Sequence, residues 1–238
     1  MVDFKRFERQ IKMKEIGPEV QRRWAESKVL IIGAGGLGCG VIQALSSAGV
    51  GSITILDGDA VAQHNLHRQW LFNESSIGFN KALKAADWVK EHNPDIQVNG
   101  IPTHLREENA SQYVKDFNVW IDATDNVSAK LLIDTLAVQY QTPWVFGSAE
   151  QWDGQVSVFQ YPDSNGKIWR YVDFFTDQLE DPMVGSCQQR GVLGPVVHTI
   201  AMFQSLEVLR ILGNLSPLHV GKMFCWDAWQ SMSYPVSL

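Results

Sequence analysis

The sequence feature that most constrains the fold is a short apolar run that ends in a cluster of glycines. Residues 29–32 read VLII, and GAGGLG at positions 33–38 comes next, before a helix-like stretch at 41–48. A continuous apolar run of this length is typical of a parallel strand that is buried on both faces. Strand, glycine turn and helix in this order predict the opening unit of an α/β fold.

Strand and helix patterns continue to alternate along the chain. Further strands are predicted at 52–56, 119–123, 144–148, 156–161 and 223–226, and helices at 81–91, 129–140 and 196–212. This alternation predicts an α/β protein with a Rossmann-like, doubly wound, mainly parallel sheet. Polar and apolar residues alternate around 155–160, so we expect C-terminal antiparallel strands to extend the sheet.

The length and composition of the chain fit one domain. A chain of 238 residues, 45% of them hydrophobic, buries one full core more readily than two small ones. We therefore expect a single domain over 1–238, with an N-terminal helical arm at 1–27, a Rossmann core at 28–150 and a C-terminal portion at 151–238. Its longest irregular stretch, 162–185, is expected to be a mobile, functional loop.

Charge and cysteine content exclude several classes of protein. The net charge is −6 without a run of Lys or Arg, so nucleic acid is not an expected partner. Polar residues interrupt the apolar stretch 192–212 and the N-terminus is charged, so neither a membrane span nor a secretory signal is expected. Three cysteines without a CxxC pair fit a reducing, cytoplasmic compartment. Cys39 and Cys225 lie in predicted core elements, whereas Cys187 lies in a loop.

The glycine cluster and a downstream acid indicate a nucleotide site. Glycines let backbone N–H groups approach phosphates at the N-terminus of a helix. Asp57 lies nineteen positions after Gly38, at the end of the next predicted strand, where a carboxylate accepts hydrogen bonds from ribose hydroxyls. A purely structural turn is the alternative, and the motif alone does not separate NAD, FAD, S-adenosylmethionine and ATP. The glycines predicted to contact the nucleotide are Gly33, Gly35, Gly36 and Gly38.

Three later segments, at 65–69, 78–81 and 124–126, narrow the choice of nucleotide. Because the C-terminal ends of neighbouring strands share a crevice, we expect Asp57, Asp125 and the loop that carries Arg68 to face one nucleotide. Two cations and a carboxylate suit a triphosphate and its Mg²⁺, because charge that builds during transfer must be offset. The alternatives are ordinary surface positions for the arginines and a helix-capping role for Asp125 beside Asn126.

In this order the segments resemble the ThiF/MoeB/HesA adenylyltransferases, which are related to ubiquitin-activating enzymes. The resemblance runs from Arg6 to about Ser233, and it rests on RFERQ at 6–10, the glycine cluster, DGD at 57–59, NLHRQ at 65–69, Lys81, TDN at 124–126, SC at 186–187 and GVLGP at 191–195. It implies ATP as cofactor, Mg²⁺ at Asp125, and a homodimer in which Arg9 reaches the neighbour's site. Besides the glycines and Asp57, the nucleotide contacts that it implies are Asp59, Asn65, Arg68, Gln69, Lys81, Asp125 and Asn126. The implied catalytic residues are Arg9, Arg68, Lys81, Asp125 and Cys187.

The resemblance also implies a reaction and a partner. A carrier's C-terminal glycine carboxylate would attack the α-phosphorus of ATP, giving an acyl-adenylate and pyrophosphate. The expected carrier is a small ubiquitin-like, β-grasp sulfur-carrier protein that ends in Gly-Gly. Residues 191–197 place thiamine slightly ahead of molybdopterin biosynthesis as the pathway. In the thiamine branch Cys187 would link covalently to the carrier, although QQR at 188–190 departs from the family pattern.

The chain differs from many such relatives where they bind zinc. IWRY at 168–171 replaces one CxxC, and the sequence ends before the second would occur, so no zinc is expected. His64 and His67 have the spacing of a metal pair but lack an evident third ligand. Two other classes stay open: a non-catalytic or specialised binder of a ubiquitin-like protein or peptide, and an NAD-dependent oxidoreductase. The oxidoreductase would leave Arg68, Lys81 and Asp125 unexplained.

Overall fold

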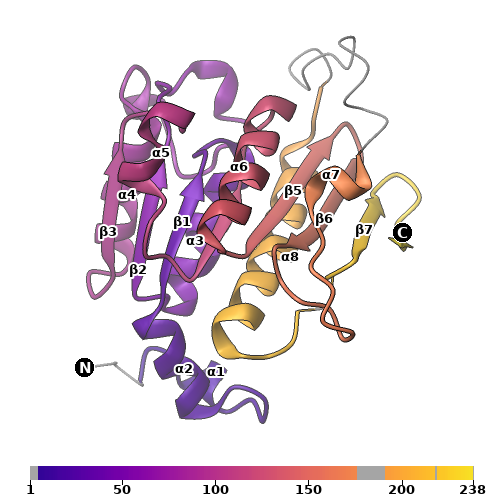
Figure 1. Ribbon diagram of the computed structural model, residues 1–238. Helices are drawn as coiled ribbons and strands as arrows, with labels where there is room; N and C mark the ends of the chain where they lie inside the picture. The colour runs from indigo at the N-terminus through magenta and orange to yellow at the C-terminus, as the bar shows by residue number, and fades with distance from the viewer. Residues whose placement is uncertain (1–4, 176–190, 218, 238) are drawn as a thin grey trace.

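The protein is built on one twisted sheet with a parallel part and an antiparallel part (Figure 1). The computed structural model describes residues 5–175, 191–217 and 219–237. Within these ranges the strand order is β3-β2-β1-β4-β5-β6-β7-β8; β1 to β5 pair in parallel, and β5 to β8 pair antiparallel. The predicted fold class is therefore confirmed. The strands are β1 Lys28–Ile32, β2 Ser52–Leu56, β3 Gln97–Ile101, β4 Val119–Asp122, β5 Trp144–Glu150, β6 Asp153–Phe159, β7 Lys222–Asp227 and β8 Met232–Ser237.

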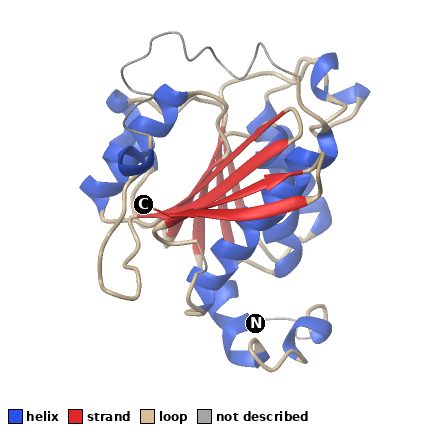
Figure 2. Ribbon diagram, turned by 90° about the vertical axis from the view of Figure 1, so that its right-hand side faces the viewer, coloured by secondary structure: helices blue, strands red, loops and turns tan. Residues whose placement is uncertain are grey.

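Helices cover both faces of the sheet, as Figure 2 shows. β1 illustrates why: Val29 and Ile31 point into the core beneath α3, α4 and α8, whereas Leu30 and Ile32 point into the core beneath α6. Alternate side chains of a strand face opposite sides, so a run of four apolar residues supplies both cores. The helices are α1 Glu8–Ile11, α2 Gly17–Glu26, α3 Gly36–Ala48, α4 Lys81–His92, α5 Glu107–Tyr113, α6 Val127–Tyr140, α7 Tyr171–Phe174 and α8 Gly194–Gly213, with 3-10 turns η1 Gln63–Asn65 and η2 Glu74–Ser76.

The glycine cluster joins β1 to α3 at very close range. Gly33 has a φ of +100°, and a side chain there would place its Cβ 2.7 Å from the Ala123 carbonyl oxygen. A Cβ on Gly38 would lie 2.2 Å from the Gly33 carbonyl oxygen. Glycine is therefore required at both positions, once for its backbone conformation and once for the packing of the helix against the strand.

The long apolar helix α8 is a core element. By length and composition it is apolar enough to cross a bilayer, but 67% of its most apolar window is buried within the protein. It packs against α3 and β5, and its buried Gln204 donates hydrogen bonds to the carbonyls of Asp122 and Val145. The amide nitrogen of this buried polar residue therefore has partners inside the fold.

Several elements differ from the sequence prediction. α3 starts at Gly36 instead of residue 41, because its glycine-rich first turn carries no helical signal. β3 and β8 are edge strands and were not predicted; a strand that lacks one neighbour and is partly exposed shows little apolar pattern. The short α5 was also missed. α7 lies within the stretch 162–185 that was predicted to be irregular, and residues 176–185 lie outside the described residues.

Candidate nucleotide-binding site

A cavity of about 1300 Å³ opens at the carboxyl ends of the parallel strands. Strands β1, β2 and β4 end at its floor, and the residues that follow them form its wall. Polar residues from separate segments meet in this one cavity, and their roles stay predictions. The predicted residues that line the cavity are Gly33, Gly35, Gly36, Asp57, Asp59, Asn65, Arg68, Gln69, Lys81, Asp125 and Asn126.

Three predicted site residues are not in this cavity wall. Gly38 is buried beneath the glycine turn, where it packs against Gly33, so its role in the structure is close packing. Arg9 is exposed on α1, at the opposite end of the sheet from the strand ends that form the cavity (Figure 1). It does not contribute to the cavity of its own chain. Cys187 lies outside the described residues.

Asp57 fixes the glycine turn and the start of the next loop. Its buried carboxylate accepts a hydrogen bond from the Ala34 N–H at Oδ2, 2.7 Å away, and another from the Asp59 N–H at Oδ1, 2.8 Å away. A carboxylate has about four acceptor positions, so two are left for hydroxyl groups of a ligand. Asp57 therefore holds the loop in place and retains acceptor capacity toward the cavity.

A chain of three charged or polar side chains lies beside Asp57. Lys81 is the first residue of α4 and is buried; its Nζ lies 2.9 Å from Asp59 Oδ2. His104, which the sequence analysis missed, places Nε2 3.3 Å from Asp59 Oδ1. Burial alone would raise the pKa of the Asp59 carboxyl, but the hydrogen bond and charge of Lys81, with help from His104, hold that pKa below its usual value. His104 was missed because it follows β3, which was itself missed.

The same region superficially resembles a metal site. Ligand atoms of Asp57, Asp59 and His104 all lie within 4.8 Å of one another. Both oxygens of Asp57, however, already accept backbone N–H groups, and the Lys81 ammonium occupies the approach to Asp59. A divalent cation would have to share this space with a positive charge. Within the described ranges, His64 and His67 do not join any such group.

The Arg68 side chain is held at the cavity by two residues that precede it in the chain. Its Nη1 donates to the His64 carbonyl oxygen at 3.1 Å and to His67 Nε2 at 2.8 Å. His67 accepts this bond, so its ring is neutral. The pKa of His67 is lowered, chiefly because the ring is partly buried and in second place because Arg68 is positively charged.

The Arg68 backbone has its own support from α8. Its carbonyl oxygen accepts a hydrogen bond from His198 Nε2 at 3.0 Å, and the His198 ring stacks on Trp70 with 3.6 Å between ring centroids. Burial lowers the pKa of His198, and it outweighs the bond to Arg68, which acts in the opposite direction. The folded protein therefore favours the neutral His198 ring more strongly than the unfolded chain does.

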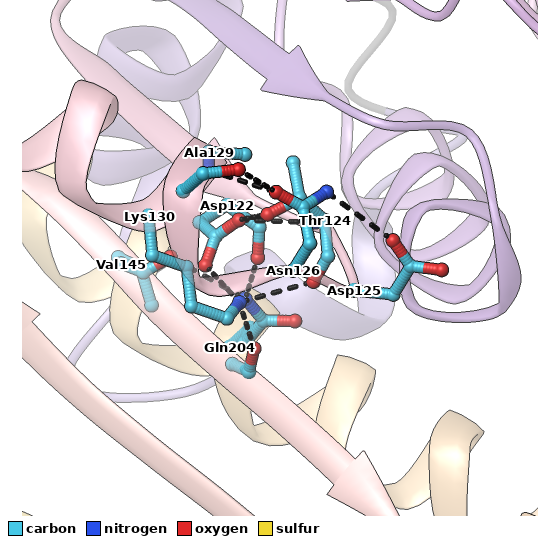
Figure 3. Close-up of polar contacts among 10 residues, drawn as sticks. Asp122, Thr124, Asp125, Asn126, Ala129, Lys130, Val145 and Gln204 are labelled. Carbon is cyan, nitrogen blue, oxygen red and sulfur yellow. Dashed lines mark hydrogen bonds and ion pairs between the residues drawn. The ribbon is translucent and has the colours of Figure 1, made fainter. Parts of the chain in front are cut away.

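The turn between β4 and α6 separates two roles that the sequence left open. Asn126 is the N-cap of α6, since its Oδ1 accepts from the Ala129 N–H at 2.8 Å. Asp125 is exposed at the cavity and accepts one long bond, 3.4 Å, from the Asn126 amide. Figure 3 shows its carboxylate directed away from the buried pair Asp122 and Lys130. Capping thus falls to Asn126, and Asp125 is available to a ligand.

Two buried amides complete the wall on the side of Arg68. Asn65 Oδ1 accepts from the Ala62 N–H at 3.0 Å, which closes the 3-10 turn before Arg68. Gln69 is buried, and its Oε1 has no hydrogen-bond partner among the described residues. A buried acceptor without a donor is costly, and a donor group on a ligand in this cavity would satisfy it. The donor set and the orphaned amide therefore fit a nucleotide such as ATP.

Comparison with known proteins agrees with this geometry. The sequence profile of the ThiF family matches residues 7–236. "Adenylyltransferase and sulfurtransferase MOCS3" of Caenorhabditis briggsae is 37% identical over 99% of the chain and 58% of its own length. "Sulfur carrier protein adenylyltransferase" of Thermus thermophilus is 34% identical over 95% of the chain and 84% of its own length. The chain spans little more than half the length of the MOCS3 relatives.

Solved structures share the fold at low sequence identity. E. coli MccB, solved with succinimide, superposes with a TM-score of 0.81 at 19% identity, covering 100% of this chain and 72% of MccB. PaaA superposes with a TM-score of 0.80 at 23% identity, covering 99% of this chain and 73% of PaaA. At these identities the likeness establishes the fold.

Proposed function

The chain belongs to the ThiF family, and from this premise we propose that it is an ATP-dependent adenylyltransferase acting on the C-terminal glycine carboxylate of a small ubiquitin-like sulfur-carrier protein. The observation that carries the proposal is the convergence of the glycine turn, Arg68, Lys81 and Asp125 on one cavity. The Thermus thermophilus relative, whose length the chain largely covers, is named for adenylation of a sulfur carrier.

The proposed reaction uses the charge of the cavity wall. A carrier carboxylate oxygen forms a bond to the α-phosphorus of ATP while the bond from that phosphorus to the pyrophosphate oxygen breaks. Negative charge that develops on the phosphates is offset by Arg68 and Lys81, which therefore act mainly by electrostatics and positioning. The attacking carboxylate is already ionised at neutral pH, so no general base is required.

The ion pair of Lys81 has a consequence for this step. Its Nζ donates to Asp59. The Asp59 carboxylate is more than half exposed, so water can replace Lys81 as its partner at small cost. We propose that Lys81 exchanges this carboxylate for a phosphate oxygen when ATP binds.

Asp125 fits the position of the Mg²⁺ ligand. An exposed carboxylate that carries one long hydrogen bond offers the hard oxygen donors that Mg²⁺ prefers, and Mg²⁺ usually takes one or two carboxylates together with substrate phosphates. Bound there, the metal would neutralise phosphate charge and assist departure of pyrophosphate.

Arg9 enters the proposal through a homodimer. Because it lies at the far end of its own sheet (Figure 1), it can assist catalysis only in the site of a second copy. Arg9→Ala and Arg68→Ala chains, each inactive alone, should regain part of the activity when mixed, since one composite site then carries both arginines. Absence of any recovery would contradict a shared site.

Cys187 belongs to a later step in this proposal. After adenylation its thiolate would attack the carbonyl carbon of the acyl-adenylate, forming a thioester with the carrier and releasing AMP. Cys187→Ala should then leave adenylate formation unchanged while it blocks later transfer. Loss of adenylation in this variant would show that the cysteine acts in adenylate formation and not after it.

The decisive experiment is exchange of radiolabelled pyrophosphate into ATP with candidate carriers ending in Gly-Gly. Carrier-dependent exchange would support adenylation, and the carrier that works would distinguish thiamine from molybdopterin biosynthesis. Asp125→Ala should abolish exchange while unfolding stays cooperative. MgATP binding without exchange would favour a specialised peptide substrate or a non-catalytic partner. Stabilisation by NAD but not by MgATP would overturn the proposal in favour of an oxidoreductase.

A further inference from the structure

Beneath the turn that carries Asp125 lies an ion pair that the proposed reaction does not use. Lys130 Nζ, from the first turns of α6, lies 2.6 Å from Asp122 Oδ2 at the end of β4, and both side chains are buried (Figure 3). The Asp122 side chain has no exposure to solvent. A ligand in the cavity cannot reach Asp122 without rearranging the turn above it.

The pair is bonded directly to the backbone of that turn. Lys130 Nζ also donates to the Thr124 carbonyl oxygen at 3.0 Å and to the Gly147 carbonyl oxygen at 3.3 Å. Asp122 Oδ1 accepts from the Thr124 N–H at 3.0 Å and from its Oγ1 hydroxyl at 2.6 Å. Thr124 is thus held at its N–H, its hydroxyl and its carbonyl by two side chains.

Asp125 is therefore fixed by its neighbours and not by a partner of its own carboxylate. Thr124 before it is held by the ion pair, and Asn126 after it is held as the cap of α6. The floor of the turn is held as well, because Gln204 of α8 donates to the Asp122 carbonyl oxygen at 2.8 Å. The backbone position of Asp125 is defined while its carboxylate stays open to the cavity.

Stability does not account for such a pair. Burying two opposite charges costs about as much desolvation as their attraction returns, and well-packed apolar replacements are often as stable or more so. A role in placing a ligand does account for it, since side chains that orient a metal ligand tune its affinity.

We propose that Lys130 and Asp122 are positioning residues that set the Mg²⁺ affinity of the site by holding the Thr124–Asn126 turn. The inference rests on the proposed function, in which Asp125 is the metal ligand. It differs from a purely structural role because it predicts that replacing the pair weakens the effect of Mg²⁺ on ATP binding and leaves metal-free ATP binding unchanged. Binding of ATP without metal depends on the glycine turn, Asp57 and Lys81, which the pair does not touch.

The test measures ATP binding by calorimetry, in EDTA and in Mg²⁺, without a carrier. In the double variant Lys130→Met/Asp122→Leu no buried charge is left unpaired, so the fold is retained while Thr124 loses its three contacts. The factor by which Mg²⁺ tightens ATP binding should fall by about 10-fold or more, as when other residues that orient metal ligands are replaced. Affinity in EDTA should stay within about 3-fold, because the contacts to ribose and phosphate are unchanged.

Two further variants separate positioning from general destabilisation. Lys130→Arg keeps a cation for Asp122 and for the carbonyls, and it should retain most of the Mg²⁺ effect. Leu136→Ala destabilises the same helix from its buried face, away from the turn, and should retain all of it. An undiminished Mg²⁺ effect in the double variant would overturn the inference. If Mg²⁺ does not change the ATP affinity of the wild-type protein, the proposed function on which this inference rests is overturned instead.

Discussion

Two Lys–Asp pairs flank the same cavity, and they differ in how far water reaches them. Lys81 and Asp59 lie 2.9 Å apart, with side-chain exposures of 8% and 55%; Lys130 and Asp122 lie 2.6 Å apart, with exposures of 6% and 0%. The two lysines are buried alike and both line the cavity, so the difference lies in the aspartates. Asp59 can exchange its lysine for water, whereas Asp122 cannot. The comparison teaches that similar ion pairs can serve different ends: in our proposal one releases its cation to a ligand, and the other holds the backbone that presents a carboxylate.

The largest expected effect comes from breaking the buried pair on one side only. Lys130→Met leaves the Asp122 carboxylate buried without a partner, so the free energy of unfolding should fall by about 3–5 kcal/mol. Urea denaturation at pH 7.5 measures this loss. Lys84→Met, at a partly exposed position on α4, is the control and should change stability little. A loss as small as that of the control would mean that the two pairs are energetically alike.

Removing the cation of the exposed pair should affect the reaction instead of the fold. Lys81→Met should lower carrier-dependent pyrophosphate exchange by about 10²–10³-fold, comparable with the removal of one preorganised donor from an active site. Its stability should stay close to that of the wild type, because Asp59 is left in contact with water. Lys84→Met serves again as the control, since it removes a cation from the same helix. Normal exchange by Lys81→Met would remove Lys81 from the mechanism.

The Arg68 side of the cavity should also be the side that responds to mild acid. The pKa of His198 is lowered mainly by burial, so the unfolded chain binds a proton at a higher pH than the folded protein does. The stability that this group contributes is fully present above its unfolded pKa, about 6.5, and is lost as the pH falls through the lower folded value.

His198→Gln should therefore flatten the loss of stability between pH 7.5 and 5.5. Gln can still donate to the Arg68 carbonyl oxygen but does not titrate. Urea denaturation at several pH values measures the difference. His67→Gln is the matched control. The pKa of His67 is lowered too, but this residue lies at a more exposed position, so its replacement should change the pH dependence less. Parallel curves for wild type and His198→Gln would show that His198 does not contribute.

The smallest effect is expected for the acid of the exposed pair. Asp59→Asn should change the free energy of unfolding at pH 7 by less than about 1 kcal/mol, because the carboxylate is mostly in water. The pKa of Asp59 is below its usual value, so this small contribution is present above about pH 4 and disappears as the pH falls through the folded value. A loss comparable to that of Lys130→Met would show that the pair is structural.

Local sequence patterns predicted most of the fold and many residues of the cavity wall. A strand, a glycine turn and a helix are specified by neighbouring residues, so β1, β2, β4 and the long helices could be predicted from periodicity and breakers. The convergence of Arg68, Lys81 and Asp125 followed from a general property of parallel sheets, whose strand ends share one edge. Edge strands such as β3 could not be predicted, because exposure removes the apolar pattern on which prediction depends.

The sequence by itself determined the fold class, the family and many of the polar residues that line the cavity. Only the tertiary structure decided which of them are engaged: that Asn126 caps α6, that Lys81 is held by Asp59, and that His104 joins them. It alone revealed the buried pair, because Asp122 reads as the polar end of a strand and Lys130 as one cation in an apolar helix. Gln204, which donates to the Asp122 carbonyl oxygen, lies 82 residues beyond it. Such contacts depend on the order of strands in the sheet and on the helix packed across it, which no local pattern encodes.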